Sequence, residues 1–244
     1  MSLLSTAHER GITTLTLDCP DNRNALSSRL VGELARALED CGKDPGVRAV
    51  VLTHTGSTFS AGADVKAPPS PYTFVALLRA IVELPKPVVA RVSGHVRAGG
   101  LGLVSACDIV AAGAEADFAL TEVRIGVAPC VISLTLLPRL DPRAAARYYL
   151  TGERFDAAEA ARIGLVTVFG DDVDGALAPV LDGLRKASPQ GLAEAKRLVT
   201  ARVLETFERD AEDVVQRSAS LFASAEAREG MTAFLERRDA AWVL

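Results

Sequence analysis

TFSAGAD at residues 58–64 and VSGHVRAGGLG at residues 92–102 are the two segments that decide the fold of this chain. Each follows a β-branched run, at residues 50–53 and 88–92, that predicts a buried strand. Glycine and alanine at such positions let backbone N–H groups approach a ligand closely, and a helix beginning after Gly99 adds a partial positive charge. Two N–H groups from two such loops can form an oxyanion hole, which stabilises charge developing on a carbonyl oxygen.

Composition restricts the broad class of the protein. The 244 residues are 49% hydrophobic and 24% charged, which is typical of a globular protein with one large core. The net charge of −4 argues against nucleic acid as the main partner. It does not exclude an anionic ligand, because local basic residues can still meet phosphates.

The cysteines and the apolar runs point to the same class. Cys19, Cys41, Cys107 and Cys130 lack the spacing of a metal site, and the last two stand in apolar surroundings typical of core residues. No run reaches the roughly 18 apolar residues of a membrane helix, and the N-terminus lacks the pattern of a signal peptide. We therefore expect a soluble cytoplasmic protein that contacts neither nucleic acid nor a membrane.

Periodicity predicts an α/β order with helices at the end. Ser27 or Ser28 is expected to cap the first helix, Asp156 and Glu159 resemble a capping box, and Ser188 with Pro189 should open the helical end. Gly164 is the expected glycine after the helix that Asp156 begins. The predicted strands are 12–17, 48–53, 88–92, 108–112, 118–120 and 165–169, and the predicted helices lie around 30–41, 72–84, 101–107 and within 189–241.

Four motifs together resemble a known family. Residues 59–64, 94–102, 106–109 and 121–126 look like the signature of the enoyl-CoA hydratase/isomerase (crotonase) family, and the likeness runs from about Gly11 to Arg238. The resemblance implies an α/β crotonase-like spiral of ββα units with a helical C-terminal trimerisation segment. It divides the chain into an acyl-CoA-binding core at 1–188 and a helical segment at 189–244. It also implies a homotrimer or hexamer.

The resemblance assigns roles to individual residues. Ala63 and Gly99 would donate the two oxyanion N–H groups to the thioester oxygen of an acyl-CoA, and Glu122 would be the catalytic glutamate. A carboxylate in an apolar pocket can have a raised pKa that suits proton transfer near neutral pH. The residues expected to contact the substrate or its CoA are Ala25, Ala61, Gly62, Asp64, Gly100, Phe234 and Arg237, the last two from a neighbouring subunit. Coenzyme A is part of the substrate, so neither a separate cofactor nor a metal is implied.

Gly102 departs from the family pattern. Two-carboxylate hydratases carry a second glutamate there, and nearby Ser105 or Ser133 would at most orient a water. With one carboxylate, Glu122 can move a proton between two carbons of an enoyl chain, which is isomerisation, or activate a water for hydration. The sequences of residues 102–108 and 121–129 are more similar to those of a single-glutamate branch of the family. Hydration of branched or dicarboxylic enoyl-CoAs, a reaction of fatty acid metabolism, is represented in that branch. Hydration is therefore favoured, with isomerisation and a non-catalytic acyl-CoA-binding protein as the alternatives.

Four polar residues near the motifs are harder to assign. Asp108 and Asp64 are expected to be structural carboxylates rather than second acids. His95 is a lone histidine in a loop, a type that is rarely catalytic. Arg97 is a hypothetical contact of the CoA phosphates or of an acidic acyl tail.

Overall fold

The computed structural model describes residues 2–64 and 66–244, and its larger sheet has the strand order β1-β2-β3-β5-β7-β10. Strand β1 pairs antiparallel with β2 at one edge, and the other neighbours are parallel. The strands are β1 (Leu4–Glu9), β2 (Ile12–Leu17), β3 (Ala49–His54), β5 (Val88–Val92), β7 (Ile109–Ala112) and β10 (Val168–Phe169).

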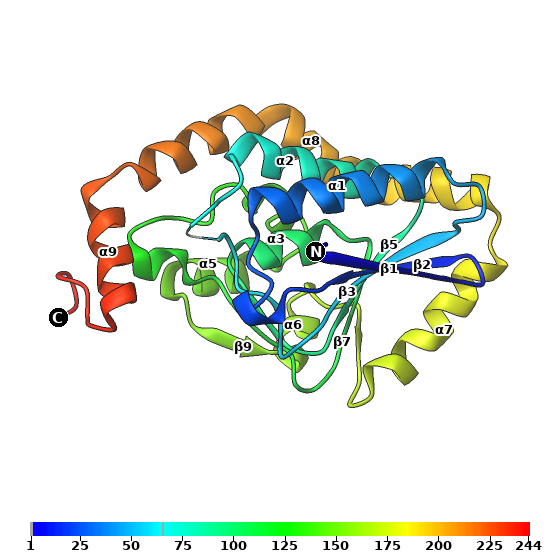
Figure 1. Cartoon of the computed structure of the whole chain (residues 1–244), viewed down its shortest axis with the longest axis horizontal. Coiled ribbons are helices and arrows are strands. Elements are labelled where there is room, and N and C mark those ends of the chain that lie inside the picture. The colour runs from blue at the N-terminus through cyan, green and yellow to red at the C-terminus, as the bar shows by residue number, and fades with distance from the viewer. Residues whose placement is uncertain (1, 65) are drawn as a thin grey trace.

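Helices cover both faces of this sheet, so its central strands are buried on both sides (Figure 1). Val50 and Leu52 join the main core, which includes helices α1 (Ser28–Lys43) and α2 (Pro71–Glu83). Their neighbours Ala49 and Val51 face the other way, into a smaller core with α7 (Val173–Lys186). This burial on both faces explains why β3 is a continuous apolar run rather than an alternating one.

A second sheet has the order β4-β6-β8-β9. Strands β4 (Thr58–Ser60), β6 (His95–Arg97) and β8 (Asp117–Ala119) are parallel neighbours, and β9 (Arg154–Asp156) pairs antiparallel with β8. Each strand has three residues, too few to produce a periodic pattern in the sequence. Only β8 overlaps a predicted strand, 118–120.

The predicted helix caps are confirmed, and one predicted strand is shorter than expected. Ser27 accepts the N–H of Leu30, and Asp156 accepts the N–H of Glu159 at 2.8 Å. The Glu159 carboxylate binds Tyr148 and Arg162, so Asp156 acts as a simple cap and not as half of a capping box.

Of the strand predicted at 165–169, only β10 at its end forms. The N–H groups of residues 165 and 166 both bond instead to the Ala160 carbonyl and extend the end of helix α6 (Ala157–Arg162). Gly164 has a φ of +91°, as expected of the glycine that ends that helix.

The remaining short elements lie between the strands, and among them α3 leads from β6 of the small sheet to β7 of the large one. They are η1 (Pro20–Asn22), α3 (Gly99–Ala106), η2 (Thr121–Ile125), α4 (Ser133–Leu136) and α5 (Pro142–Thr151).

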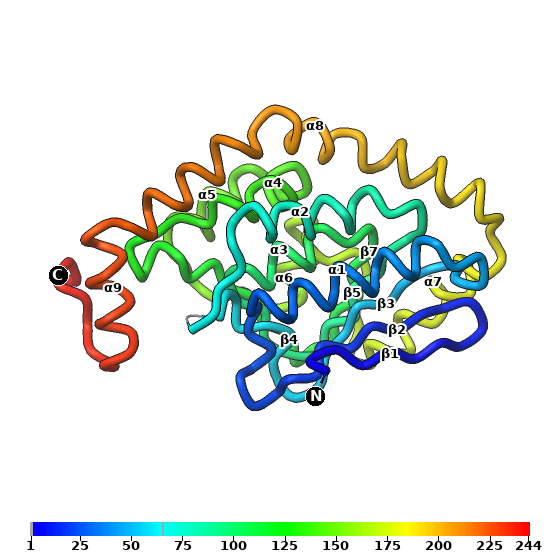
Figure 2. Tube along the Cα trace, turned by 45° about the horizontal axis from the view of Figure 1, so that its top comes forward, coloured from blue at the N-terminus to red at the C-terminus, as the bar shows by residue number. Residues whose placement is uncertain are grey.

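The helical end arches over the body of the protein (Figure 2). Helix α8 (Pro189–Phe222) is capped by Ser188 and packs on α2 and α4. Helix α9 (Ala225–Glu236) then packs against η2, and a Cβ on Gly230 would lie 2.5 Å from the Ile125 carbonyl carbon. In residues 2–64 and 66–244, no helix combines the length and the apolar character needed to cross a membrane.

Candidate active site

Three sequence motifs meet at one edge of the small sheet. Ala63 follows β4, Gly99 follows β6 and Glu122 follows β8, and these strands are parallel neighbours. The carboxyl ends of parallel strands lie at the same edge of a sheet, which is where α/β proteins bind ligands. The structure therefore brings together the three residues to which the sequence assigns the reaction.

The first loop presents its backbone toward the second. The N–H of Leu26 bonds to the Gly62 carbonyl at 2.7 Å, and the N–H of Asp64 bonds to the Leu26 carbonyl at 3.0 Å. Because these two bonds flank Ala63 on the side of Leu26, the N–H of Ala63 itself points away from that residue. Gly62 has a φ of +92°, a conformation that favours glycine.

The two loops are in van der Waals contact. A Cβ on Gly62 would lie 2.9 Å from the Ala98 Cβ and 3.5 Å from the Gly99 nitrogen. Gly99 is the first residue of α3, so its N–H has no partner within the helix and carries part of the positive end of the helix dipole. Gly100 packs closely on β4, where an added Cβ would lie 3.0 Å from the Ser60 carbonyl oxygen.

Asn24 holds the segment that contains Ala25, an expected CoA contact, against the first loop. Its buried side chain accepts the N–H of Cys19 and donates to the carbonyls of Thr55 and Thr58. This turn leads through Ala25 to Leu26, whose backbone bonds to Gly62 and Asp64. Ala61 is tied to the same turn by its N–H, which bonds to the Arg23 carbonyl at 3.0 Å.

Glu122 is an acid held in an apolar environment. Only 9% of the residue is exposed, and Phe118, Leu120 and Val127 around it in sequence are buried. Burial raises the pKa of Glu122 to about 7. In the part of the chain that the structure describes, its Oε2 has no hydrogen-bond partner. Such a carboxyl group can accept and return a proton near neutral pH.

An apolar side chain fills the space beside Gly102. A Cβ on this glycine would lie 2.5 Å from Cγ2 of Ile132 and 3.5 Å from Cδ1 of Leu78. Ile132 thus occupies the space that a side chain at position 102 would need.

The nearby polar residues have structural partners. Ser105 shares a 2.7 Å hydrogen bond with Thr135, and Ser133 donates to the Cys130 carbonyl at 2.6 Å. Asp108 pairs with Lys196 at 2.8 Å and accepts the N–H of Val88. Asp108 is therefore a structural carboxylate, as the sequence indicates.

Arg97 and His95 bind the same carboxylate. The Arg97 guanidinium donates to both oxygens of Asp117, at 2.9 and 2.8 Å, and to the carbonyls of Val96 and Asp117. His95 contacts Asp117 through Nδ1. These contacts engage the guanidinium within its own sheet, which weighs against the hypothesis that Arg97 binds the phosphates or the acyl tail.

Two predicted contacts lie at the end of the chain. Phe234 is 66% exposed on α9, and Arg237 is exposed at its C-terminal cap. Their contact with the CoA of a neighbouring subunit stays a prediction. Asp64 accepts the N–H of Lys66 at 2.8 Å.

Two residues near Glu122 were not predicted to belong to the site. The charge of Glu122 contributes to raising the pKa of both Tyr149 and Cys130, after the larger effect of burial. Tyr149 comes from α5, whose sequence carries no motif. A buried tyrosine in a helix is usually a core residue, so the sequence offered no signal for it.

Comparison with known proteins agrees with this geometry. The sequence profile described as enoyl-CoA hydratase/isomerase matches residues 7–243. A relative from Thermus thermophilus is 34% identical over 246 residues, which cover 94% of this chain and 97% of the relative. The mitochondrial enoyl-CoA hydratase of Pongo abelii is 31% identical, with 96% of this chain and 86% of the relative covered.

A solved structure extends the likeness to the whole fold. The crystal structure of an enoyl-CoA hydratase from Mycobacterium avium is 54% identical and superposes with a TM-score of 0.94 over 100% of both chains. The fold, the sequence motifs and these matches agree that this chain belongs to the enoyl-CoA hydratase/isomerase family of enzymes.

Proposed function

We propose that this enzyme adds water to the double bond of a 2-enoyl-CoA and forms a 3-hydroxyacyl-CoA. The observation that carries the proposal is the buried Glu122, with a pKa of about 7, at the same sheet edge as the Ala63 and Gly99 loops. An acyl-CoA thioester at this edge would have a proton-transfer group and two backbone donors within one site.

The backbone donors would act on the thioester oxygen. In our proposal the N–H groups of Ala63 and Gly99 form the oxyanion hole, and both come from segments with little side-chain bulk. As the β-carbon is attacked, the electrons of the double bond move toward the thioester oxygen. Fixed donors stabilise this developing charge without having to reorganise.

Glu122 would carry the proton. Its carboxylate takes a proton from the water as the water oxygen bonds to the β-carbon. The resulting carboxylic acid then returns the proton to the α-carbon, so that one water is added in total. A pKa near the operating pH suits both halves of this cycle.

Isomerisation of a 3-enoyl-CoA to a 2-enoyl-CoA is the second candidate. The observation that favours it is Ile132 beside Gly102, because this reaction needs no water and no second carboxylate. Glu122 would take a proton from the α-carbon and return it to the γ-carbon, while the oxyanion hole holds the dienolate.

Substrate panels with a Glu122→Gln control distinguish these reactions. Crotonyl-CoA and 3-methylglutaconyl-CoA are incubated with the enzyme, and the loss of the conjugated thioester absorbance is followed. The hydroxyacyl-CoA product is then identified by mass spectrometry. We expect hydration that falls by about 10²–10⁴-fold in the variant, the effect of one positioned acid–base group. Conjugation that appears with 3-enoyl-CoAs, without hydration, would replace the proposal by isomerisation. Retained CoA binding without turnover on either panel would contradict both.

Three finer expectations stay predictions of the family resemblance. They are assembly as a homotrimer or hexamer, a cytoplasmic location and a preference for branched or dicarboxylic acyl groups. Sedimentation of the purified protein tests the first, and the substrate panel tests the last.

A further inference from the structure

A cavity of about 300 Å³ lies between α5, α8 and residues 128–133. Its outer rim includes the exposed Asp213 and Arg217 of α8, so it opens toward solvent. Tyr149 of α5 lines it. The volume is ample for several waters, which need polar partners to be held.

Most polar groups that line this cavity already have partners. Ser133 donates to the Cys130 carbonyl, and Asp213 pairs with Arg217 at 2.6 Å. Asp210 pairs with Arg209 at 2.7 Å. The Tyr149 hydroxyl is different, because it is buried and has no hydrogen-bond partner within residues 2–64 and 66–244. A buried hydroxyl without a partner is costly unless it has a role.

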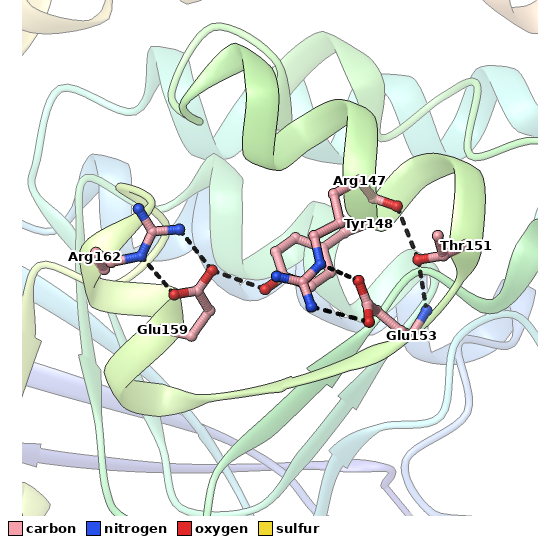
Figure 3. Close-up of polar contacts among 6 residues, drawn as sticks. All are labelled: Arg147, Tyr148, Thr151, Glu153, Glu159 and Arg162. Carbon is pink, nitrogen blue, oxygen red and sulfur yellow. Dashed lines mark hydrogen bonds and ion pairs between the residues drawn. The ribbon is translucent and has the colours of Figure 1, made fainter.

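Helix α5 is held firmly on its other side. Figure 3 shows Tyr148 donating to Glu159, which also binds Arg162, while Arg147 binds Glu153. Tyr148 and Tyr149 are neighbours in sequence but point in different directions, since consecutive helical residues are 100° apart. The Tyr148 hydroxyl therefore belongs to a network separate from the cavity that Tyr149 lines.

The end of α5 also contacts the segment that carries Glu122. Arg124 of η2 donates to the Thr151 carbonyl at 3.4 Å, and a Cβ on Gly152 would lie 3.1 Å from the Leu120 carbonyl oxygen. Glu122 lies between residues 120 and 124. Its Oε2 and the Tyr149 hydroxyl are both buried and both without a hydrogen-bond partner in the described part of the chain. The charge of Glu122 also acts on the Tyr149 hydroxyl, in the direction that raises the pKa of this tyrosine.

We propose that Tyr149 is a positioning residue that holds the substrate water against Glu122, in place of the carboxylate that Gly102 lacks. The inference rests on the hydration proposed above. The water donates one hydrogen to Oε2 of Glu122 and the other to the Tyr149 oxygen, which leaves its lone pairs free for the β-carbon. Tyr149 neither gains nor loses a proton, so the balance of the reaction is unchanged.

Tyr149→Phe tests the proposal, because it removes only the hydroxyl and keeps the ring. Tyr148→Phe is the matched control, since it removes a neighbouring hydroxyl whose partner is Glu159. For both variants we would measure kcat and KM for hydration, and the melting temperature. We would also measure the pKa of Glu122 from the infrared band of its carboxyl group, which is identified by its absence in Glu122→Gln. The infrared titration requires no turnover.

For Tyr149→Phe we expect kcat to fall about tenfold or more, with KM within about twofold, the effect of one hydrogen bond made in the transition state. Its melting temperature should not fall, because the hydroxyl has no hydrogen-bond partner among the residues that the structure describes. The pKa of Glu122 should rise, because a less firmly held water stabilises the carboxylate less. Tyr148→Phe should instead lower the melting temperature and leave kcat and the pKa of Glu122 unchanged.

Other outcomes overturn the inference. An unchanged kcat with an unchanged Glu122 titration removes Tyr149 from the site. A loss of kcat that follows a loss of folded protein makes Tyr149 structural. If the wild type does not hydrate any enoyl-CoA, the proposed reaction fails, and the infrared titration still decides whether Tyr149 and Glu122 share a water.

Discussion

The substitution Gly102→Ala tests the contact between position 102 and Ile132, where the family pattern would place a second carboxylate. The new Cβ would lie 2.5 Å from Cγ2 of Ile132, well inside van der Waals contact, and Ile132 is 3% exposed. Without that contact, alanine for glycine inside a helix would stabilise the protein by about 1 kcal/mol. Overpacking costs about 1–3 kcal/mol. We therefore expect a net change in the free energy of unfolding between about zero and a loss of 2 kcal/mol.

The same substitution should have the opposite sign once Ile132 is shortened. Ile132→Ala alone should cost about 2–5 kcal/mol, because it leaves a cavity. In that background the nearest remaining Ile132 atom lies 3.2 Å from the new Cβ, so Gly102→Ala should gain its helix propensity and fill part of the space. The expected coupling between the two sites is about 1–3 kcal/mol.

Urea unfolding of the four proteins at one fixed protein concentration measures this coupling, because oligomer stability depends on concentration. Equal effects of Gly102→Ala in both backgrounds, within about 0.5 kcal/mol, would refute the reasoning. It would mean that Ile132 does not occupy the position of the missing carboxylate. If the coupling is found, Gly102→Glu should support hydration better with Ile132→Ala than alone, as assayed by the absorbance of crotonyl-CoA.

Three further outcomes follow from the structure. Glu122 has a pKa of about 7 against an ordinary 4.5, so the folded state binds its proton more tightly and the free energy of unfolding should fall between those pH values. The fall is roughly 3 kcal/mol at 1.36 kcal/mol per pH unit, and Glu122→Gln should abolish it in urea titrations at several pH values. Asp108→Asn should destabilise the protein by about 3–5 kcal/mol, because it leaves Lys196 buried without its partner, while kcat per folded molecule stays unchanged. Gly62→Ala should lower the kcat of the folded enzyme, because its Cβ would push Ala98 and the second loop away. Equal kcat in variant and wild type, measured below both melting temperatures, would contradict that geometry.

Much of the fold could be predicted from local sequence. The caps at Ser27, Asp156 and Ser188 are local hydrogen bonds within three residues of the chain, so residue identity is enough to predict them. Strands β3 and β5 are long apolar runs buried on both faces. The strand predicted at 165–169 is reduced to β10, because the carbonyl of Ala160, a residue of the preceding helix, binds the N–H groups of residues 165 and 166.

Strand β1 and helices α5 and α7 were not predicted. Strand β1 is exposed along most of its length at the edge of the sheet, so it carries little apolar pattern. Strands β4, β6 and β9 were missed because three residues cannot show a period of two.

The sequence by itself determined which residues are available for the chemistry. Ala63, Gly99 and Glu122 stand in recognisable motifs, and the absence of a side chain at Gly102 is a property of the sequence alone. Only the tertiary structure decided that these motifs share a site, because three short strands far apart in the chain pair side by side and end at one edge. It also decided that Ile132 fills the space beside Gly102, and that the Tyr149 hydroxyl is buried with no hydrogen-bond partner in the described part of the chain. Such relations depend on the packing of distant elements, and no local pattern of residues encodes them.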